Sequence, residues 1–498
     1  MAEVATSSDI TGEHETVNIE ARPNNPITEE WKAILRGMNS VTSTPSRESK
    51  RGMMQKVPQI MRIQNQQEYD PMVVSLGPYH HSKQELQLAE KFKPIALRLY
   101  VSYCLGSTTD DLYNKVLEVI GFARRSYIEG STDAYSDEEL ALMMLLDACF
   151  ILNVIHCVSL KLPYLQEQET RFPYYSLTPF TPSVDVEMDE ERMTDVDRVV
   201  LIYHEHLGGL GWVNIFRDMF LLENQLPCEV LHVLLLFRFG SRETGDDMIK
   251  KFIDFIVYRQ RIRKNEVLIF SSQRFHPPLH LLEIYRTSFL NRSHSQQHSG
   301  RWKDKCRLSE SSYTHYTHSC RSVTELKAKG IRFRPSIGKS LTDIKFDSNT
   351  LFGQLELPPR IITSKAKAIF LNLIAYEMCP YTPNDFSVTS YFGFMKSLIN
   401  HPNDVKELRS KHILLNKLDS DKDVANMYAD ISIPTVNNAI FEDVEESIQE
   451  HYNNKAKTWI AELISEYLSS PWTAIALLAA IFLLVLSFLQ TYFTISKA

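Results

Sequence analysis

The sequence predicts a mainly α-helical protein of the α+β class, with a small β element in its second half and one C-terminal transmembrane helix. Three patterns predict this architecture. Residues 467–496 carry no charged side chain. Residues 140–158 are apolar on nearly every side, which is typical of a central buried helix. Short alternating segments bounded by Gly and Pro lie between residues 331 and 357, and such alternation is typical of strands.

Composition places the chain among ordinary globular proteins. It has 498 residues, of which 44% are hydrophobic and 23% are charged, enough for one large domain or for two or three smaller ones. The net charge of −7 means that no global basic field points to nucleic acid as a partner. The seven cysteines are scattered, and the lack of a dense disulfide framework indicates a reducing compartment.

The first half of the body is expected to be helical. Residues 1–50 are acidic and poor in apolar side chains, so we expect an acidic N-terminal segment that is disordered. Residues 51–285 then form the helical first half. They contain an amphipathic stretch at 86–99, which Pro94 should break or kink, and an apolar helical region that Pro227 divides.

A polar and basic segment, 286–320, is expected to form an exposed linker between two halves of the body. The second half, 321–466, opens with a capping pattern in which Ser322 is the N-cap and Glu325 stands at the third helical position. Gly330 should end that helix. The expected strands lie at 331–333, 343–346 and 355–357, and the expected helices lie at 364–379 and 404–428.

The last segment, 467–498, is expected to be a membrane anchor. A helix from Trp472 to Ile495 would be about 36 Å long at 1.5 Å per residue, enough to cross a hydrocarbon core of ~30 Å. Aromatic side chains near both ends of this helix suit the membrane interfaces. Membrane lipid is then the partner of the helix. The representative anchor residues are Trp472, Leu477, Ile481, Leu484, Phe488 and Ile495.

The position of the apolar helix predicts a single-pass, tail-anchored protein whose body is cytosolic. Only two residues follow residue 496, and the first ten residues have neither the basic nor the apolar region of a signal peptide. We expect the plasma membrane rather than an endomembrane. The alternative is a buried helix of a large globular core, although such helices are usually shorter.

A search for catalytic motifs favours a protein that is not an enzyme. The chain has no Walker A loop, no dinucleotide-binding glycine fingerprint and no nucleophile elbow. His204-Glu205-His206 resembles a zinc protease motif, but Gly208 stands where the second histidine would be needed. The histidines and cysteines of the basic linker lack a Cys-x-x-Cys pair. We therefore predict no cofactor, no metal site and no catalytic residue.

Three carboxylates inside apolar runs need partners, because a buried carboxylate must be paired or hydrogen-bonded. They are Asp147, Glu223 and Glu377. We expect each to cap a helix or to pair with an arginine. The candidate arginines are Arg62, Arg124 and Arg217.

The alternative is an uncharacterised enzyme whose site is assembled from distant parts of the chain. Asp147, Glu223 and either His80 or His81 would then converge in a concave polar pocket, with carboxyl pKa values shifted for catalysis. Pairing of the carboxylates with arginines in a packed interior would count against this alternative.

Several blocks of the sequence together carry a family resemblance. They are 57–62, 69–71, 74–81, 143–152, 221–227, 321–326, 372–377, Ser390-Tyr391 and Pro471-Trp472. These blocks resemble the plant DUF247 family, also called UPF0481 proteins, from about residue 52 to the C-terminus. The sequence departs from the usual family pattern at Ser126, Ala148 and Asn153, which puts in doubt any role assigned to those side chains.

The resemblance implies a plant protein without established catalytic residues. Some grass members of the family lie at self-incompatibility loci and look like pollen-side determinants of self recognition. We therefore predict a non-enzymatic, membrane-anchored recognition or signalling protein, with a self-incompatibility role as one implication of the resemblance. A protein partner would bind the acidic loop 183–197 and the basic loop 291–322, whose opposite charges would select it. A scaffold or stress-response protein is a further alternative.

Overall fold

The computed structural model describes most of the body and the C-terminal helix. The described residues are 53–104, 106–169, 195–258, 278–290, 321–338, 340–349, 352–382, 384–433, 440–454 and 471–496. The predicted acidic segment 1–50 and nearly all of the loops 183–197 and 291–322 lie outside these residues. Their predicted roles therefore stay predictions.

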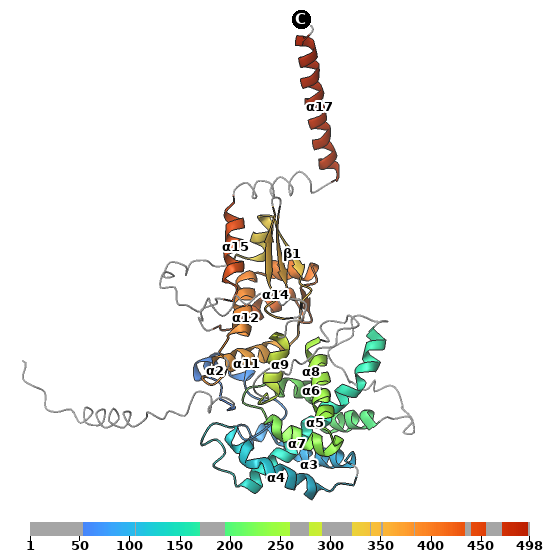
Figure 1. The fold of residues 1–498 in the computed structure, drawn as a ribbon, viewed down its shortest axis with the longest axis vertical. Coiled ribbons are helices and arrows are strands. Elements are labelled where there is room, and N and C mark those ends of the chain that lie inside the picture. Colours follow the sequence, from blue (N-terminus) through green and yellow to red (C-terminus); the bar gives the residue numbers. More distant parts are fainter. Residues whose placement is uncertain are drawn as a thin grey trace, which may run out of the picture. The chain divides into compact units, whose positions relative to one another are not determined.

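The first half of the body is helical, as predicted (Figure 1). Its elements are α2 (Gln59–Asn65), η1 (Gln66–Glu68), η2 (Gln84–Leu86), α3 (Gln87–Ser102), α4 (Thr109–Arg125), α5 (Asp137–Glu169), α6 (Asp195–Asp218), α7 (Cys228–Phe239), α8 (Arg242–Tyr258) and α9 (Leu281–Leu290). Pro94 does not break α3, because buried side chains on both sides of it hold the helix against its neighbours. Pro227 does divide the chain, since α7 begins directly after it.

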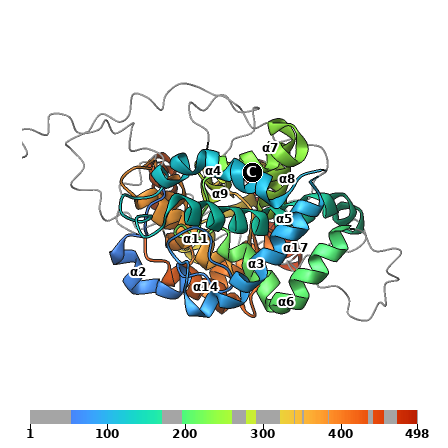
Figure 2. The ribbon, with the colours of Figure 1, turned by 90° about the horizontal axis from the view of Figure 1, so that it is seen from below.

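Helix α5 is the centre of this half (Figure 2). It contacts α3, α4, α6, α7 and α8, and the side chains from Ala148 to Leu152 are almost completely buried. Its segment Asp137–Leu160 is long and apolar enough to cross a membrane, but 83% of the apolar window is buried inside the protein. The predicted central core helix is therefore confirmed, and its apolar surface is covered by other helices.

The second half combines helices with two small sheets. Its elements are α10 (Val323–Ala328), β1 (Ile331–Pro335), β2 (Lys345–Ser348), β3 (Gly353–Leu357), β4 (Arg360–Ile362), α11 (Ala366–Met378), α12 (Ser387–Leu398), α13 (Pro402–Ser410), β5 (Leu414–Asn416), α14 (Asp421–Asp430) and α15 (Glu442–Asn453). One sheet has the order β1-β3-β2, with β1 parallel and β2 antiparallel to β3. In the other sheet, β4 and β5 run parallel.

The predicted N-cap of α10 is confirmed, whereas the prediction of one helix at 404–428 is wrong. Ser322 accepts a hydrogen bond from the N–H of Glu325 as the N-cap of α10. The region 404–428 is instead two helices, α13 and α14, with β5 between them. His412 takes a left-handed conformation (φ 58°) after α13, and Ser420 caps the start of α14, so the chain turns twice where one helix was expected.

The two halves share one continuous core. The buried cluster includes side chains from α5 and α7 as well as from α11 and α12. Asn372 on α11 accepts the N–H of Leu222 and donates to the carbonyl of Glu68. Arg286 on α9 pairs with Glu377 on α11, and both side chains are buried. Hydrogen bonds and an ion pair thus join elements far apart in sequence.

The C-terminal helix α17 (Pro471–Ser496) is the second segment long and apolar enough to cross a membrane. Its candidate span, Leu478–Ser496, has none of its apolar window buried by the protein. The two apolar helices of the chain therefore differ in burial, although they are similar in composition.

His280 directly precedes α9, and its burial makes the free energy of unfolding depend on pH. It is 1% exposed, and its Nδ1 accepts the N–H of Glu283. Burial lowers the imidazole pKa from 6.5 to about 3. Between these values the unfolded chain binds a proton that the folded chain does not bind. The stability from neutral His280 is thus present above pH 6.5 and decreases as the pH falls below it.

We expect His280→Asn to remove this pH dependence while keeping the helix cap, since asparagine is a preferred N-cap residue. Between pH 7 and pH 5 the wild-type chain should lose about 2 kcal/mol of unfolding free energy more than the variant. Denaturant unfolding of both proteins at the two pH values measures this difference. Equal pH dependence of the two proteins would contradict the assignment to His280.

Candidate functional site

The residues predicted for the alternative enzyme site lie around an irregular, largely buried segment, residues 70–77, in which Met72 is exposed. This segment has neither helix nor strand structure, so its backbone N–H and C=O groups need partners from elsewhere. Side chains of α3, α5 and the turn that follows α6 provide them. The sequence blocks 57–62, 69–71, 74–81, 143–152 and 221–227 therefore meet at this segment.

Asp218, at the end of α6, makes the largest number of these contacts. Its carboxylate accepts the N–H groups of Met72, Val73 and Val74, with the shortest distance 2.7 Å to Val73. Arg217 pairs with the same carboxylate at 3.0 Å and donates to the carbonyl of Asp70 at 2.9 Å. Because Asp218 is completely buried, its hydrogen bonds fix the path of the segment.

Asn224 and Glu223, in the turn between α6 and α7, hold neighbouring parts of the chain. Asn224 accepts the N–H of Leu76 at 2.7 Å and donates to the carbonyl of Val74 at 3.0 Å. Glu223 accepts the N–H of Val57 at 2.7 Å and pairs with Arg62. The predicted pairing of Glu223 with Arg62 is therefore present.

Asp147 pairs with a lysine rather than with one of the predicted arginines. Its carboxylate lies 2.5 Å from Nζ of Lys93 and accepts the N–H of Gly77 at 2.8 Å. Both charged side chains are 1% exposed. Burial raises the pKa of Asp147, and Lys93 opposes that shift. Lys93 also donates to the carbonyl of Ser75, so the ion pair joins α3, α5 and the irregular segment.

The other carboxylate partners confirm one expectation and correct another. Glu377 is paired with Arg286, which was not among the candidate arginines. Arg217 and Arg124 instead pair with Asp218 and Asp137. The buried carboxylates do have charged partners. The sequence does not show which partner each carboxylate takes, because the two residues of a pair lie far apart along the chain.

The two histidines of the alternative site are placed differently. His80 is 3% exposed, and its Nε2 lies 3.6 Å from Glu223. Burial lowers its pKa to about 4, so the imidazole is neutral at pH 7. His81 is more exposed, and its Nδ1 lies 3.9 Å from Glu90. The structure thus brings His80 near Glu223, while Asp147 makes its contacts with Lys93 and Gly77.

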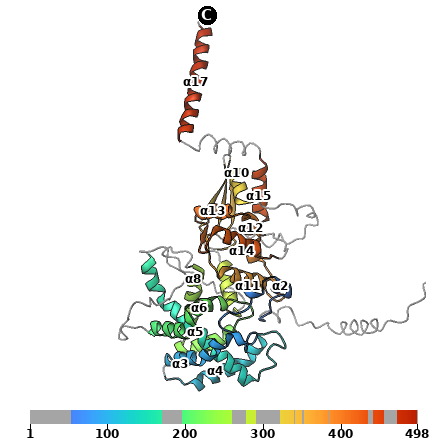
Figure 3. The same ribbon diagram turned by 180° about the vertical axis from the view of Figure 1, so that it is seen from behind.

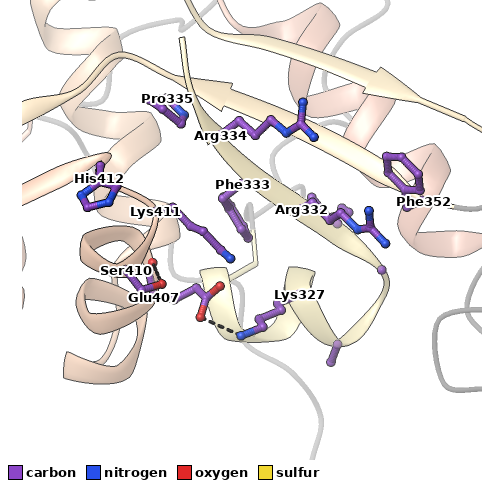
Figure 4. Close-up of a pocket in the computed structure, with 13 residues that line it drawn as sticks. Lys327, Arg332, Phe333, Arg334, Pro335, Phe352, Glu407, Ser410, Lys411 and His412 are labelled. Atoms are coloured by element: carbon purple, nitrogen blue, oxygen red, sulfur yellow. Dashed lines mark hydrogen bonds and ion pairs between the residues drawn. The ribbon is translucent and has the colours of Figure 1, made fainter. Parts of the chain in front are cut away.

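A separate pocket lies in the second half of the body, between α10, β1 and the end of α13 (Figure 4). Figure 3 shows the position of α10 and α13 in this half. It has a volume of about 670 Å³. Its basic side chains are Lys327, Arg332, Arg334 and Lys411, with His412 also in the lining. Its single acidic side chain is Glu407, which pairs with Lys327 at 2.6 Å. We call this site the basic pocket.

Sequence reasoning did not identify the basic pocket. Arg332 lies on the predicted strand 331–333, whereas Arg334 lies one residue beyond it. In the structure both arginines belong to β1 and share one face of that strand. Lys411 follows about eighty residues later, and nothing in the sequence connects it to that strand. The pairing of α10 with α13 brings these residues together.

The predicted anchor residues all lie in α17. Trp472, Ile481, Leu484, Phe488 and Ile495 have side chains between 49% and 79% exposed. Leu477 belongs to the same helix. Exposed apolar side chains of this size along a whole helix are expected where lipid or another apolar partner covers them.

We expect Asp147→Ala to lower the unfolding free energy by about 3 kcal/mol, because it leaves the N–H of Gly77 without its acceptor and the buried Lys93 with one carboxylate, Glu90, in place of two. The double variant Lys93→Met/Asp147→Asn should recover most of that loss, since the amide still accepts the N–H of Gly77 while both charges are absent. Denaturant unfolding of the three proteins measures this. A single variant as stable as wild type would show that the ion pair does not support the segment.

Comparison with known proteins identifies the family. Residues 54–486 match the family DUF247, described as a plant protein of unknown function. The chain is 26% identical over 461 residues to the UPF0481 protein At3g47200 of Arabidopsis thaliana, covering 88% of this chain and 84% of that relative. It is 22% identical over 514 residues to the putative UPF0481 protein At3g02645 of the same plant, covering 88% and 89%. No solved structure matches the chain.

The family match extends through the irregular segment, the central helix α5 and both sheets of the second half. It includes the residues that hold the segment, from Arg62 to Asn224. Because the match spans most of the chain, this protein belongs to the DUF247 (UPF0481) family of plant proteins.

Proposed function

We propose that this protein is a non-enzymatic recognition or signalling protein whose folded body is attached to a membrane by α17. The single observation that carries the proposal is the contrast between its two apolar helices. The body covers 83% of the apolar window of α5 but none of that of α17. An exposed apolar helix of this length needs an apolar environment, and a lipid bilayer provides one of matching thickness.

Two further observations support a body in the cytosol. Among the described residues, Cys104, Cys149, Cys228 and Cys379 are free and buried, which suits a reducing compartment. The body has a packed core, in which the charges of Lys93–Asp147 and Arg286–Glu377 are paired. We extend the proposal to a single-pass arrangement at the plasma membrane.

The non-enzymatic part of the proposal rests on the roles of the buried carboxylates. Asp147 and Glu223 each accept a backbone N–H and pair with a cation. A carboxylate engaged in this way is poorly placed to exchange protons with a substrate. The neutral His80 lies near Glu223 but is almost completely buried, so a substrate would have little access to it.

Recognition of a protein partner through loops 183–197 and 291–322 stays a prediction, as does a role in self-incompatibility. Exchange of both loops between two family members, followed by measurement of partner binding, tests the first of these. The partner preference should follow the loops. Partner choice that stays with the body would contradict the recognition role of the loops.

We expect Ile481→Lys/Leu484→Lys to release the protein from membranes, because each lysine near the centre of a spanning helix costs roughly 2.5–3.5 kcal/mol. Carbonate extraction followed by sedimentation measures attachment. Leu210→Lys is the matched control, since Leu210 is an exposed leucine on α6, and it should remain in the membrane fraction. Attachment of the double variant equal to that of the control would contradict the anchor.

Protease protection on intact membranes tests the orientation. With one tag at each end, we expect the N-terminal tag to be digested from the cytosolic side because the body is exposed there. The C-terminal tag should be protected until detergent opens the membrane. A protected N-terminal tag would place the body on the opposite side of the membrane.

A further inference from the structure

The basic pocket has the dimensions of a small-molecule site. Its volume of about 670 Å³ lies within the range of ~300–1,000 Å³ that is usual for ligand pockets. Its walls come from α10, β1 and α13, and α10 contacts both of the other elements. Apolar side chains, among them Phe333 and Phe352, share the lining with the basic ones.

The charge of the pocket contrasts with that of the chain. The protein carries a net charge of −7, yet four lysine and arginine side chains and one carboxylate line this pocket. Glu407 is paired with Lys327. Among the residues that the structure describes, no carboxylate partner is found for Arg332, Arg334 or Lys411. Three cations without an ion pair among the described residues therefore border the pocket, and Glu356 stands next to Arg334 in the strand register.

One contact orients Arg332 before any ligand arrives, and Arg334 extends beside it from the same strand. The guanidinium of Arg332 lies 4.1 Å from the ring centroid of Phe352, an arrangement that favours the cation and orients its plane. Arg332 and Arg334 are two residues apart on one strand, so they extend from the same face of β1 (Figure 4). Pre-oriented guanidinium groups lose less entropy when they bind an anion.

The turn after α13 carries a local strain at the pocket. His412 has φ 58°, a conformation that glycine usually provides at the end of a helix. The N–H of Ile413 bonds to the carbonyl of Leu408 at 2.9 Å, which closes this helix end. His412 is exposed, so its packing offers little compensation for the strain. Strained residues gather at functional sites, and this turn carries both Lys411 and His412 into the lining.

We propose that the basic pocket binds a small phosphorylated molecule with several negative charges. Arginine forks match phosphate oxygens with two parallel hydrogen bonds, and lysine adds a point charge. A nucleic acid would require an extended basic surface, which the acidic chain does not indicate. The same phosphate chemistry occurs in a soluble metabolite and in the headgroup of a phosphorylated lipid. The proposal does not depend on membrane attachment.

The test uses the full-length chain in phosphatidylcholine nanodiscs, titrated by calorimetry with inositol hexakisphosphate. We expect saturable binding with wild type. Arg334→Ala and Lys411→Ala should each weaken it about tenfold, as loss of one charged hydrogen bond does. Both side chains are exposed, so each variant should keep the wild-type Tm.

Lys406→Ala is the matched control, because Lys406 is an exposed lysine on α13 outside the pocket lining. It should bind as wild type does. Binding that is absent from wild type, or equally affected by Lys406→Ala and Lys411→Ala, would overturn the proposal. An unchanged affinity in both pocket variants would overturn it as well.

A second arm distinguishes the two sources of phosphate. The titration is repeated in nanodiscs in which one tenth of the lipid is a phosphatidylinositol phosphate. A lipid headgroup in the pocket would compete with the soluble probe and lower its apparent affinity in wild type but not in Lys411→Ala. A soluble ligand is indicated if the added lipid leaves the affinity of wild type unchanged. Either result supports a phosphate site and assigns its source.

Discussion

The first half of the structure depends on the hydrogen bonds that Asp218 accepts from the backbone N–H groups of residues 72–74. A buried segment without helix or strand has no internal partners for its N–H groups. The buried carboxylate of Asp218 accepts three of them, and Asn224 accepts the N–H of Leu76. Without these acceptors the segment could not lie against α3 and α5, because each unsatisfied group would cost about 1–3 kcal/mol.

The same constraint explains why polar residues with catalytic appearance gather inside the body. Asp147, Glu223 and Glu377 each accept backbone N–H groups and pair with a cation. Their partners come from other elements, so each pair also joins parts of the chain distant in sequence. Because removal of one partner leaves a buried charge, the network makes the arrangement of the elements specific as well as stable.

Much of the fold could be predicted from sequence wherever the signal is local. The central helix α5, the Ser322 cap and the three strands of the larger sheet follow from periodicity and capping residues. The need of the buried carboxylates for partners follows from their apolar surroundings. Their actual partners could not be predicted, since Lys93 and Arg286 reach them only through tertiary packing. The basic pocket escaped prediction for the same reason.

The two apolar helices show how far composition alone can determine environment. Both pass the same test of length and apolarity, and periodicity cannot separate a buried helix from a spanning one. Five packed helices surround α5, whereas the apolar window of α17 is uncovered within the described chain. Polar side chains make the difference visible in the sequence: Asp147 and Asn153 lie within α5, and each has a hydrogen-bonding partner in the body. Residues 472–495 carry no ionisable acid or base other than tyrosine. This part of α17 therefore has no charged side chain that would need a partner in an apolar environment.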